Sequence, residues 1–225
     1  QPLWLLLLFG FVFSTVMKVQ PLGARTDRFA VFLFCGLLPW MAVQEGVLRA
    51  ASAITDNASL VKKLRFPSEV LVATVVAAAL LHEGIAATIF GVTLLVLGEG
   101  SWQSLPWLLV AIPFQVLLTV GLGFCVSSAH VFFRDTSQVL GMGLTAWFYV
   151  TPIVYPLEFV PERLRGWIEL NPLTGLVDLY RRAFLGAPGP IPWRSLVSLG
   201  LISLAFAAFG AWLFRRLKPA FVDQV

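Results

Sequence analysis

The chain has 225 residues, of which 58% are hydrophobic and only 12% are charged, and its mean hydropathy is +0.85. Water-soluble domains carry about 25% charged residues, so this composition excludes a soluble enzyme. The net charge of +4 is dispersed between long apolar runs, which favours lipid headgroups over nucleic acid as the partner. Both cysteines lie inside uncharged runs and indicate neither a disulfide framework nor a zinc site. We therefore expect a multi-pass membrane protein without a metal of its own.

Apolar runs free of Lys and Arg recur along the whole chain. A helix needs about 20 residues to cross about 30 Å of hydrocarbon, and these runs have roughly that length. They are continuously apolar, so helices are favoured over barrel strands and the predicted fold class is all-α. The first run lacks the charged leader and cleavage site of a signal peptide and is counted as a span. We predict one membrane domain, 1–225, that crosses six times, at about 2–17, 29–47, 70–97, 105–128, 138–156 and 195–213.

The direction of insertion does not follow from charge. Six crossings place both ends on one side of the membrane, and the 16 Lys and Arg residues then divide equally between the two sides. The positive-inside rule consequently favours neither orientation.

A short amphipathic helix is predicted at 57–66, between the second and third spans. Asp56, Asn57 or Ser59 can cap its start, and Pro67 ends it. One of its faces is apolar and the other cationic, formed by Leu60, Val61 and Leu64 and by Lys62, Lys63 and Arg65. So short a helix needs a surface to lie against, which is either lipid headgroups or a groove in a cytoplasmic partner protein.

The segment 157–192 is too polar to be a span, yet its apolar residues have helical spacing in two pieces. We predict short helices at 162–170 and 175–185, divided by Asn171-Pro172. Two interpretations remain open, a re-entrant or interfacial pair that closes a pathway and a loop that lies on the bilayer outside the cytoplasm.

Three titratable residues, Glu45, His82 and Glu83, fall within predicted spans. Such residues are functional candidates by default because they are costly in a membrane. No second carboxylate or Lys lies in register to form a proton relay, so hydrogen bonding to a neighbouring helix is the favoured explanation.

Aromatic residues differ in depth. Most tryptophans lie near span ends, where they are typical anchors at the membrane interface. A deeper group consists of Trp40, Trp147, Tyr149 and Tyr155. These residues either line a route for sugars, whose apolar ring faces stack on aromatic rings, or pack against other helices.

Catalytic signatures are missing from the sequence. It contains no phosphate-binding Gly-x-x-x-x-Gly-Lys-Ser/Thr loop, no His-Glu-x-x-His and no Gly-x-Ser-x-Gly. Ser127, Ser128 and His130 lie close together but have no acid to orient the imidazole. The chain is therefore predicted to be neither an enzyme nor an ATPase.

A set of motifs in a fixed order carries a family resemblance. They are Asn57-Ala-Ser-Leu-Val-Lys-Lys-Leu-Arg-Phe-Pro67, Val131-Phe-Phe-Arg-Asp135, Thr151-Pro-Ile-Val-Tyr-Pro156, Val160-Pro-Glu-Arg-Leu-Arg165, Asn171-Pro-Leu-Thr174 with Tyr180-Arg181, and Phe214-Arg-Arg-Leu-Lys218. With them the chain resembles the membrane permease of ATP-binding-cassette (ABC) exporters for polysaccharides, the O-antigen, capsule and teichoic acid group. Members of that group usually begin with a cytoplasmic amphipathic helix, whereas this sequence starts at the first span.

The resemblance implies a homodimer in the bacterial inner membrane, with cytoplasmic termini and two separate ATPase subunits that bind ATP and Mg²⁺. Segment 57–66 would be the coupling helix that contacts the ATPase, and segment 157–192 would close the periplasmic exit. The implied ATPase contacts are Asn57, Leu60, Lys62, Lys63, Leu64, Arg65, Phe66, Arg134 and Asp135. The implied gate residues are Asn171, Pro172, Tyr180 and Arg181. The cargo would be a polysaccharide or a lipid-linked polysaccharide, moving along the deep aromatic residues.

Three other functions remain open at this point. An export permease for a drug or a small lipid would have the same architecture. A membrane enzyme acting on lipid-linked sugars would use Glu83 and His82 as acid and base. A membrane anchor or assembly factor would use Lys62 and Lys63 to bind lipid alone. The particular polymer and the identity of the ATPase do not follow from the sequence.

Overall fold

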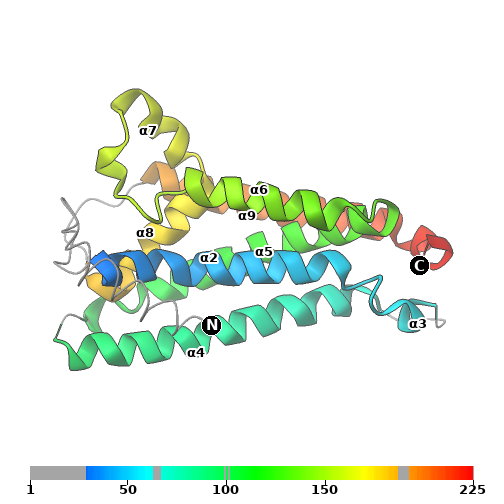
Figure 1. Ribbon diagram of the computed structural model, residues 1–225, viewed down its shortest axis with the longest axis horizontal. Coiled ribbons are helices and arrows are strands. Elements are labelled where there is room, and N and C mark those ends of the chain that lie inside the picture. The colour runs from blue at the N-terminus through cyan, green and yellow to red at the C-terminus, as the bar shows by residue number, and fades with distance from the viewer. Residues whose placement is uncertain (1–28, 63–66, 99, 101, 187–192, 225) are drawn as a thin grey trace. The chain divides into compact units, whose positions relative to one another are not determined.

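The computed structural model describes residues 29–62, 67–98, 100, 102–186 and 193–224. Within these ranges all regular structure is helical, which confirms the predicted all-α class (Figure 1). The longer helices are α2 (Phe29–Ser52), α4 (Glu69–Val96), α5 (Trp107–Phe132) and α9 (Trp193–Gln224). The shorter ones are α3 (Ala58–Val61), η2 (Trp102–Ser104), α6 (Thr136–Val150), η3 (Leu157–Phe159), α7 (Glu162–Glu169) and α8 (Pro172–Leu185).

Among the described helices, α2, α4, α5 and α9 are long and apolar enough to cross a membrane. The shortest, α2, has 24 residues and is about 36 Å long, which exceeds the roughly 30 Å of hydrocarbon. These helices correspond to the second, third, fourth and sixth predicted spans, and the chain is a polytopic membrane protein. The first predicted span, 2–17, lies outside the described residues.

The fifth predicted span, 138–156, corresponds to α6, which has 15 residues and ends at Val150. Proline disfavours helical geometry at the residue before it, so Pro152 stops the helix near Thr151. The Tyr155 hydroxyl donates hydrogen bonds to the carbonyls of Tyr149 and Val150, at 3.1 and 3.2 Å. These bonds satisfy acceptors that the end of a helix leaves without a partner.

Contacts divide the chain into two compact units. Unit 1 takes in the described residues of Gln1–Met41, Glu83–Pro113 and Phe148–Leu199. Unit 2 takes in the described residues of Ala42–His82, Phe114–Trp147 and Gly200–Val225.

Unit 1 is built around α8. All but two residues of this helix are buried, including the side chains of Arg181 and Arg182. Phe184 of α8 packs against Phe90 of α4 with ring centroids 5.2 Å apart, and Phe90 contacts Phe34 of α2 at 4.8 Å. Helix α8 is thus enclosed by protein, whereas α7 in the same segment exposes Trp167 by 74%; the two interpretations of the segment 157–192 stay predictions.

The helix α8 begins three residues earlier than the sequence suggested. Asn171 is its N-cap, with its side-chain oxygen accepting a hydrogen bond from the Leu173 amide at 3.1 Å, and Pro172 occupies the first turn. Asparagine and proline are favoured at these positions, so Pro172 starts the second helix and is not merely the end of the first.

In unit 2, α5 and α9 approach each other at two glycines. A Cβ added to Gly121 would lie 2.5 Å from the backbone nitrogen of Ala207, and one added to Gly210 would contact the carbonyl of Gly121. Only glycine allows the two backbones to come this close, as is common between membrane helices.

Candidate functional site: a basic turn, the buried helix α8 and a polar cluster

The predicted coupling helix is described only in its first half. Helix α3 covers Ala58–Val61, Lys62 follows as its C-cap, and residues 63–66 lie outside the described residues. Four predicted ATPase contacts fall in that last stretch, namely Lys63, Leu64, Arg65 and Phe66. Asn57 precedes α3 but does not cap it with its side chain; its amide donates to the carbonyl of Ala53 at 2.9 Å. This bond ties the turn back to the segment that follows α2.

Helix α3 rests on an apolar cluster in unit 2. Val61 is buried in it, Leu60 packs against it, and Lys62 is exposed. The cluster comprises Ala50, Ala53, Ile54, Val61, Leu71, Val72, Val131, Phe214 and Phe221. The expected division into an apolar and a cationic face therefore holds where α3 is described. Lys62 is therefore exposed next to a residue, Val61, that is buried in the apolar cluster.

An ion pair supports the same region, and the sequence analysis missed it. Lys218 of α9 donates to the carboxylate of Glu69, the first residue of α4, at 2.7 Å. Each side chain is 34% exposed, so the pair lies at the edge of unit 2 and is partly screened by solvent. It joins residues 149 apart in sequence, a pairing that no local pattern indicates.

The second predicted ATPase contact is the connection between α5 and α6. Arg134 and Asp135 are exposed there, beside Phe133, whose exposed fraction is 72%. Asp135 accepts hydrogen bonds at its backbone carbonyl from the amides of Gln138 and Val139, at 3.1 Å each. Because the side chains of Arg134 and Asp135 are exposed, both are accessible to a partner protein.

The deep aromatic residues divide into buried and exposed ones. Trp40 is 3% exposed and packs against Phe148 with ring centroids 5.5 Å apart, so its ring lies inside unit 1. Trp147 is partly buried, whereas Tyr149 is 69% exposed. Tyr155 holds the end of α6 through its hydroxyl. The pathway role of these four residues stays a prediction, for which Tyr149 offers the most accessible ring.

The predicted gate residues belong to α8 and its N-cap, where they make interhelical contacts within unit 1. The Asn171 amide donates to the hydroxyl of Thr151 at 2.9 Å. Arg181 donates to the carbonyl of Ile153 at 2.8 Å, and its guanidinium carbon lies 3.6 Å from the centre of the Phe32 ring. Pro172 starts the helix. These contacts hold α8 to α2 and to the turn that follows α6.

The titratable residues of the spans find partners on neighbouring helices, as the sequence analysis favoured. Glu83 of α4 is hydrogen-bonded to Tyr180 of α8, and both side chains are buried. Burial and the adjacent Glu83 carboxylate raise the pKa of Tyr180, so the phenol stays protonated and donates this bond. His82 contacts Glu45 of α2 instead. Glu83 and His82, the acid and base of the alternative membrane enzyme, therefore contact different groups.

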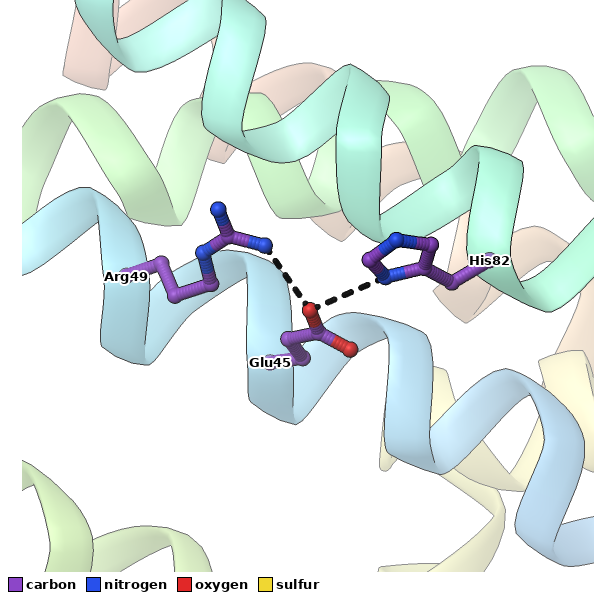
Figure 2. A network of polar contacts seen from close by, with 3 residues as sticks. All are labelled: Glu45, Arg49 and His82. Atoms are coloured by element: carbon purple, nitrogen blue, oxygen red, sulfur yellow. Dashed lines mark hydrogen bonds and ion pairs between the residues drawn. The ribbon is translucent and has the colours of Figure 1, made fainter. Parts of the chain in front are cut away.

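A three-residue polar cluster links α2 and α4 in unit 2. Arg49 Nη1 lies 2.9 Å from Glu45 Oε1, and His82 Nδ1 lies 3.2 Å from the same oxygen. Figure 2 shows the guanidinium and the imidazole converging on this one oxygen of Glu45. The sequence analysis singled out Glu45 and His82 but did not pair them. No group of three potential metal ligands occurs among the described residues.

Comparison with known proteins identifies the family. Residues 1–185 match the family described as "ABC-2 type transporter". The chain is 30% identical over 226 residues to the "O-antigen export system permease protein RfbA" of Myxococcus xanthus, with 98% of this chain and 83% of that protein covered. A protein of the same name from Klebsiella pneumoniae is 29% identical over 227 residues, covering 99% and 84%.

A more distant relative is the "Polysialic acid transport protein KpsM" of Escherichia coli, 24% identical over 225 residues, with 98% of this chain and 84% of that protein covered. The matched residues include the basic turn, the α5–α6 connection and α8, where three of the sequence motifs lie, whereas the motif at 214–218 follows the matched range. On these grounds the chain is a non-catalytic membrane permease subunit that associates with an ABC ATPase, and it belongs to the ABC-2 type transporter family.

Proposed function

We propose that this protein is the permease of an ATP-driven exporter that moves polysaccharide, free or lipid-linked, out of the bacterial cytoplasm. Two copies would form the path across the inner membrane, and two ATPase subunits would bind ATP and Mg²⁺. The proposal on cargo is supported by the names of the relatives, since O-antigen and polysialic acid are both polysaccharides. The permease performs no covalent step in this scheme; it contributes different affinities for the polymer in two states.

The observation that carries the proposal is the supported basic turn. Val61 anchors α3 in a buried cluster while Lys62 stays exposed, so a force applied to the turn reaches α2, α4 and α9 through packed side chains. An anchor that used Lys62 and Lys63 only to bind lipid would not require such a rigid base. ATP binding would draw the ATPase subunits together, and the two turns would follow them.

Within the membrane, aromatic side chains would contact the moving polymer. Tyr149 supports this because its ring is exposed at the end of an apolar helix. A polymer of sugars presents apolar ring faces and hydroxyl groups alternately, and an aromatic ring can pack against the former without holding the chain tightly. Trp147 is the neighbouring candidate, whereas Trp40 and Tyr155 would act by shaping the path through their contacts with α6.

The test of the ATPase contact is charge reversal on the basic turn. The double variant Lys62→Glu/Lys63→Glu should lose the co-purifying ATPase and export, because two cations that attract the partner become anions. The matched control is Arg163→Glu/Arg194→Glu, which makes the same change of charge at two exposed residues of α7 and α9. The control should retain the ATPase. Equal retention in both variants would contradict the proposed coupling role.

The test of the cargo is transport by the permease and ATPase reconstituted together in vesicles. ATP-dependent movement of a polysaccharide across the vesicle membrane is the expected result. Tyr149→Ala should reduce the rate and Tyr149→Phe should keep most of it, since phenylalanine retains the ring. Transport of a small lipid or a drug, with no movement of polysaccharide, would refute the cargo and leave the coupling role standing.

A further inference from the structure

Glu45 and His82 of the polar cluster lie inside helices that can span the membrane, and Arg49 lies in the last turn of α2. Glu45 is seven residues before the end of α2, and His82 is thirteen residues after the start of α4. At 1.5 Å per residue, these offsets are about 10 and 20 Å. Both helices are among those long and apolar enough to cross the bilayer. Glu45 and His82 are therefore set back from the helix ends at which charged side chains usually meet headgroups, whereas Arg49 lies in the last turn of α2.

The cluster is only partly covered by its own chain. The exposed fractions of the side chains are 39% for Glu45, 47% for Arg49 and 59% for His82. An ion pair that faced hydrocarbon at this depth would be very unfavourable, whereas charged groups in spans commonly face protein or a water-filled cavity. The exposed side of the cluster consequently requires a polar environment in the assembled transporter.

The internal contacts leave hydrogen-bonding groups of both kinds. Arg49 and His82 both contact Oε1 of Glu45, and neither of these two contacts uses Oε2 (Figure 2). His82 Nδ1 faces Glu45, which leaves its Nε2 on the far side of the ring. Arg49 has further N–H donors beyond the one that contacts Glu45. The cluster thus offers an acceptor, donors and an imidazole nitrogen to a ligand.

The charge of the cluster selects the kind of ligand. The guanidinium of Arg49 is already balanced by the carboxylate of Glu45, at 2.9 Å. An anionic ligand would be repelled by Glu45 and would have to displace it from Arg49. A neutral ligand with many hydroxyl groups would meet no such repulsion, because each hydroxyl both donates and accepts.

We propose that Glu45, Arg49 and His82 line the water-filled part of the export path and form exchanging hydrogen bonds with the sugar hydroxyls of the moving polymer. This inference rests on the proposed function. Its specific content is that the ion pair between Glu45 and Arg49 keeps the site neutral overall, so that the polymer is solvated there without being trapped. His82 extends the same polar surface from α2 to α4.

Accessibility to water is the first test. In a Cys35→Ala/Cys125→Ala background, His82→Cys and Leu81→Cys are compared in vesicles that contain the permease and its ATPase. Leu81 is the matched control because it is adjacent on α4 and 69% exposed, but carries an apolar side chain. A charged, membrane-impermeant methanethiosulfonate reacts with thiolate, which forms in water and not in hydrocarbon, so His82→Cys should react more than about tenfold faster. Equal, slow reaction at both positions would overturn the inference.

Contact with the polymer is the second test. Polysaccharide held in the transporter by a non-hydrolysable ATP analogue should slow modification of His82→Cys several-fold. Glu45→Leu should lower polymer transport several-fold while the ATPase still co-purifies. Unchanged modification together with normal transport by Glu45→Leu would overturn the inference.

The two proposals fail in distinguishable ways. If the unaltered permease and ATPase move no polysaccharide, the proposed function fails whatever the thiol chemistry shows. If they do move polysaccharide and His82→Cys reacts as slowly as Leu81→Cys, the cluster does not line the path and only the further inference fails.

Discussion

The close contact between α5 and α9 makes Gly210→Ala the most sharply defined substitution in the chain. The added methyl carbon would contact the carbonyl oxygen of Gly121 and lie 3.0 Å from its carbon and 3.2 Å from its Cα. Ordinary van der Waals contact begins at about 3.4 Å. All three atoms are backbone, so no side chain can rotate away. The helices themselves have to separate by several tenths of an ångström or more.

The expected loss of stability combines two opposing effects. Overpacking a tight contact costs about 1–3 kcal/mol, and a contact against backbone belongs at the upper end of that range. Alanine is more favourable than glycine in a helix by about 1 kcal/mol, which offsets part of the loss. We expect a net destabilisation of about 1–2 kcal/mol. For a chain of this size that corresponds to a fall of roughly 2–8 °C in Tm.

Thermal unfolding of the purified protein in detergent, followed by tryptophan fluorescence, measures this change. The matched control is Gly84→Ala in α4, where an added methyl would meet no atom within 4 Å. The control should keep or slightly raise the Tm, because it gains helix propensity without a clash. Gly121→Ala addresses the same contact from α5 and should resemble Gly210→Ala. If Gly210→Ala were as stable as Gly84→Ala, the argument from backbone proximity would be refuted.

Two further predictions concern the base of the basic turn and the start of α8. Phe221→Ala removes a fully buried ring from the apolar cluster beneath α3 and should destabilise this region by about 3–5 kcal/mol. Trypsin should then cleave the protein faster after Lys62. The control is Val222→Ala, at an exposed neighbouring residue, and this variant should be cleaved at the normal rate. Asn171→Ala loses both the N-cap bond and the bond to Thr151 and should cost about 1–2 kcal/mol in thermal unfolding, whereas Asn171→Asp keeps the cap acceptor and should lose less. Identical Tm values for these two variants would contradict the capping role.

The sequence located α4 and α5 well because hydropathy is a property of each segment by itself. Helices α4 and α5 begin and end within about four residues of the predicted limits, since lipid allows few alternatives to an apolar helix. The end of α6 was placed too late because the apolar run continues past Pro152, although the proline itself is a stop signal; the helix ends at Val150.

The contacts across helices could not be predicted. Glu45 and His82 are 37 residues apart and Glu69 and Lys218 are 149 apart, so their pairing depends on how the helices pack. Sequence reasoning identified Glu45 and His82 as unusual through their cost in a membrane, but it could not say which residue would meet which. The burial of Trp40 behind Phe148 is a consequence of packing in the same way.

The enclosed arginines of α8 have a consequence for biogenesis. Arginine at the centre of an inserting helix is unfavourable by about 2.5–3.5 kcal/mol per residue, so a segment with two of them would be rejected by the translocon as an independent span. Arg181 contacts the Phe32 ring and donates a hydrogen bond to the Ile153 carbonyl. Both of these groups precede α8 in the chain. They have been synthesised by the time the ribosome reaches α8. The helix can therefore dock late, onto an existing receptor, instead of partitioning into lipid by itself.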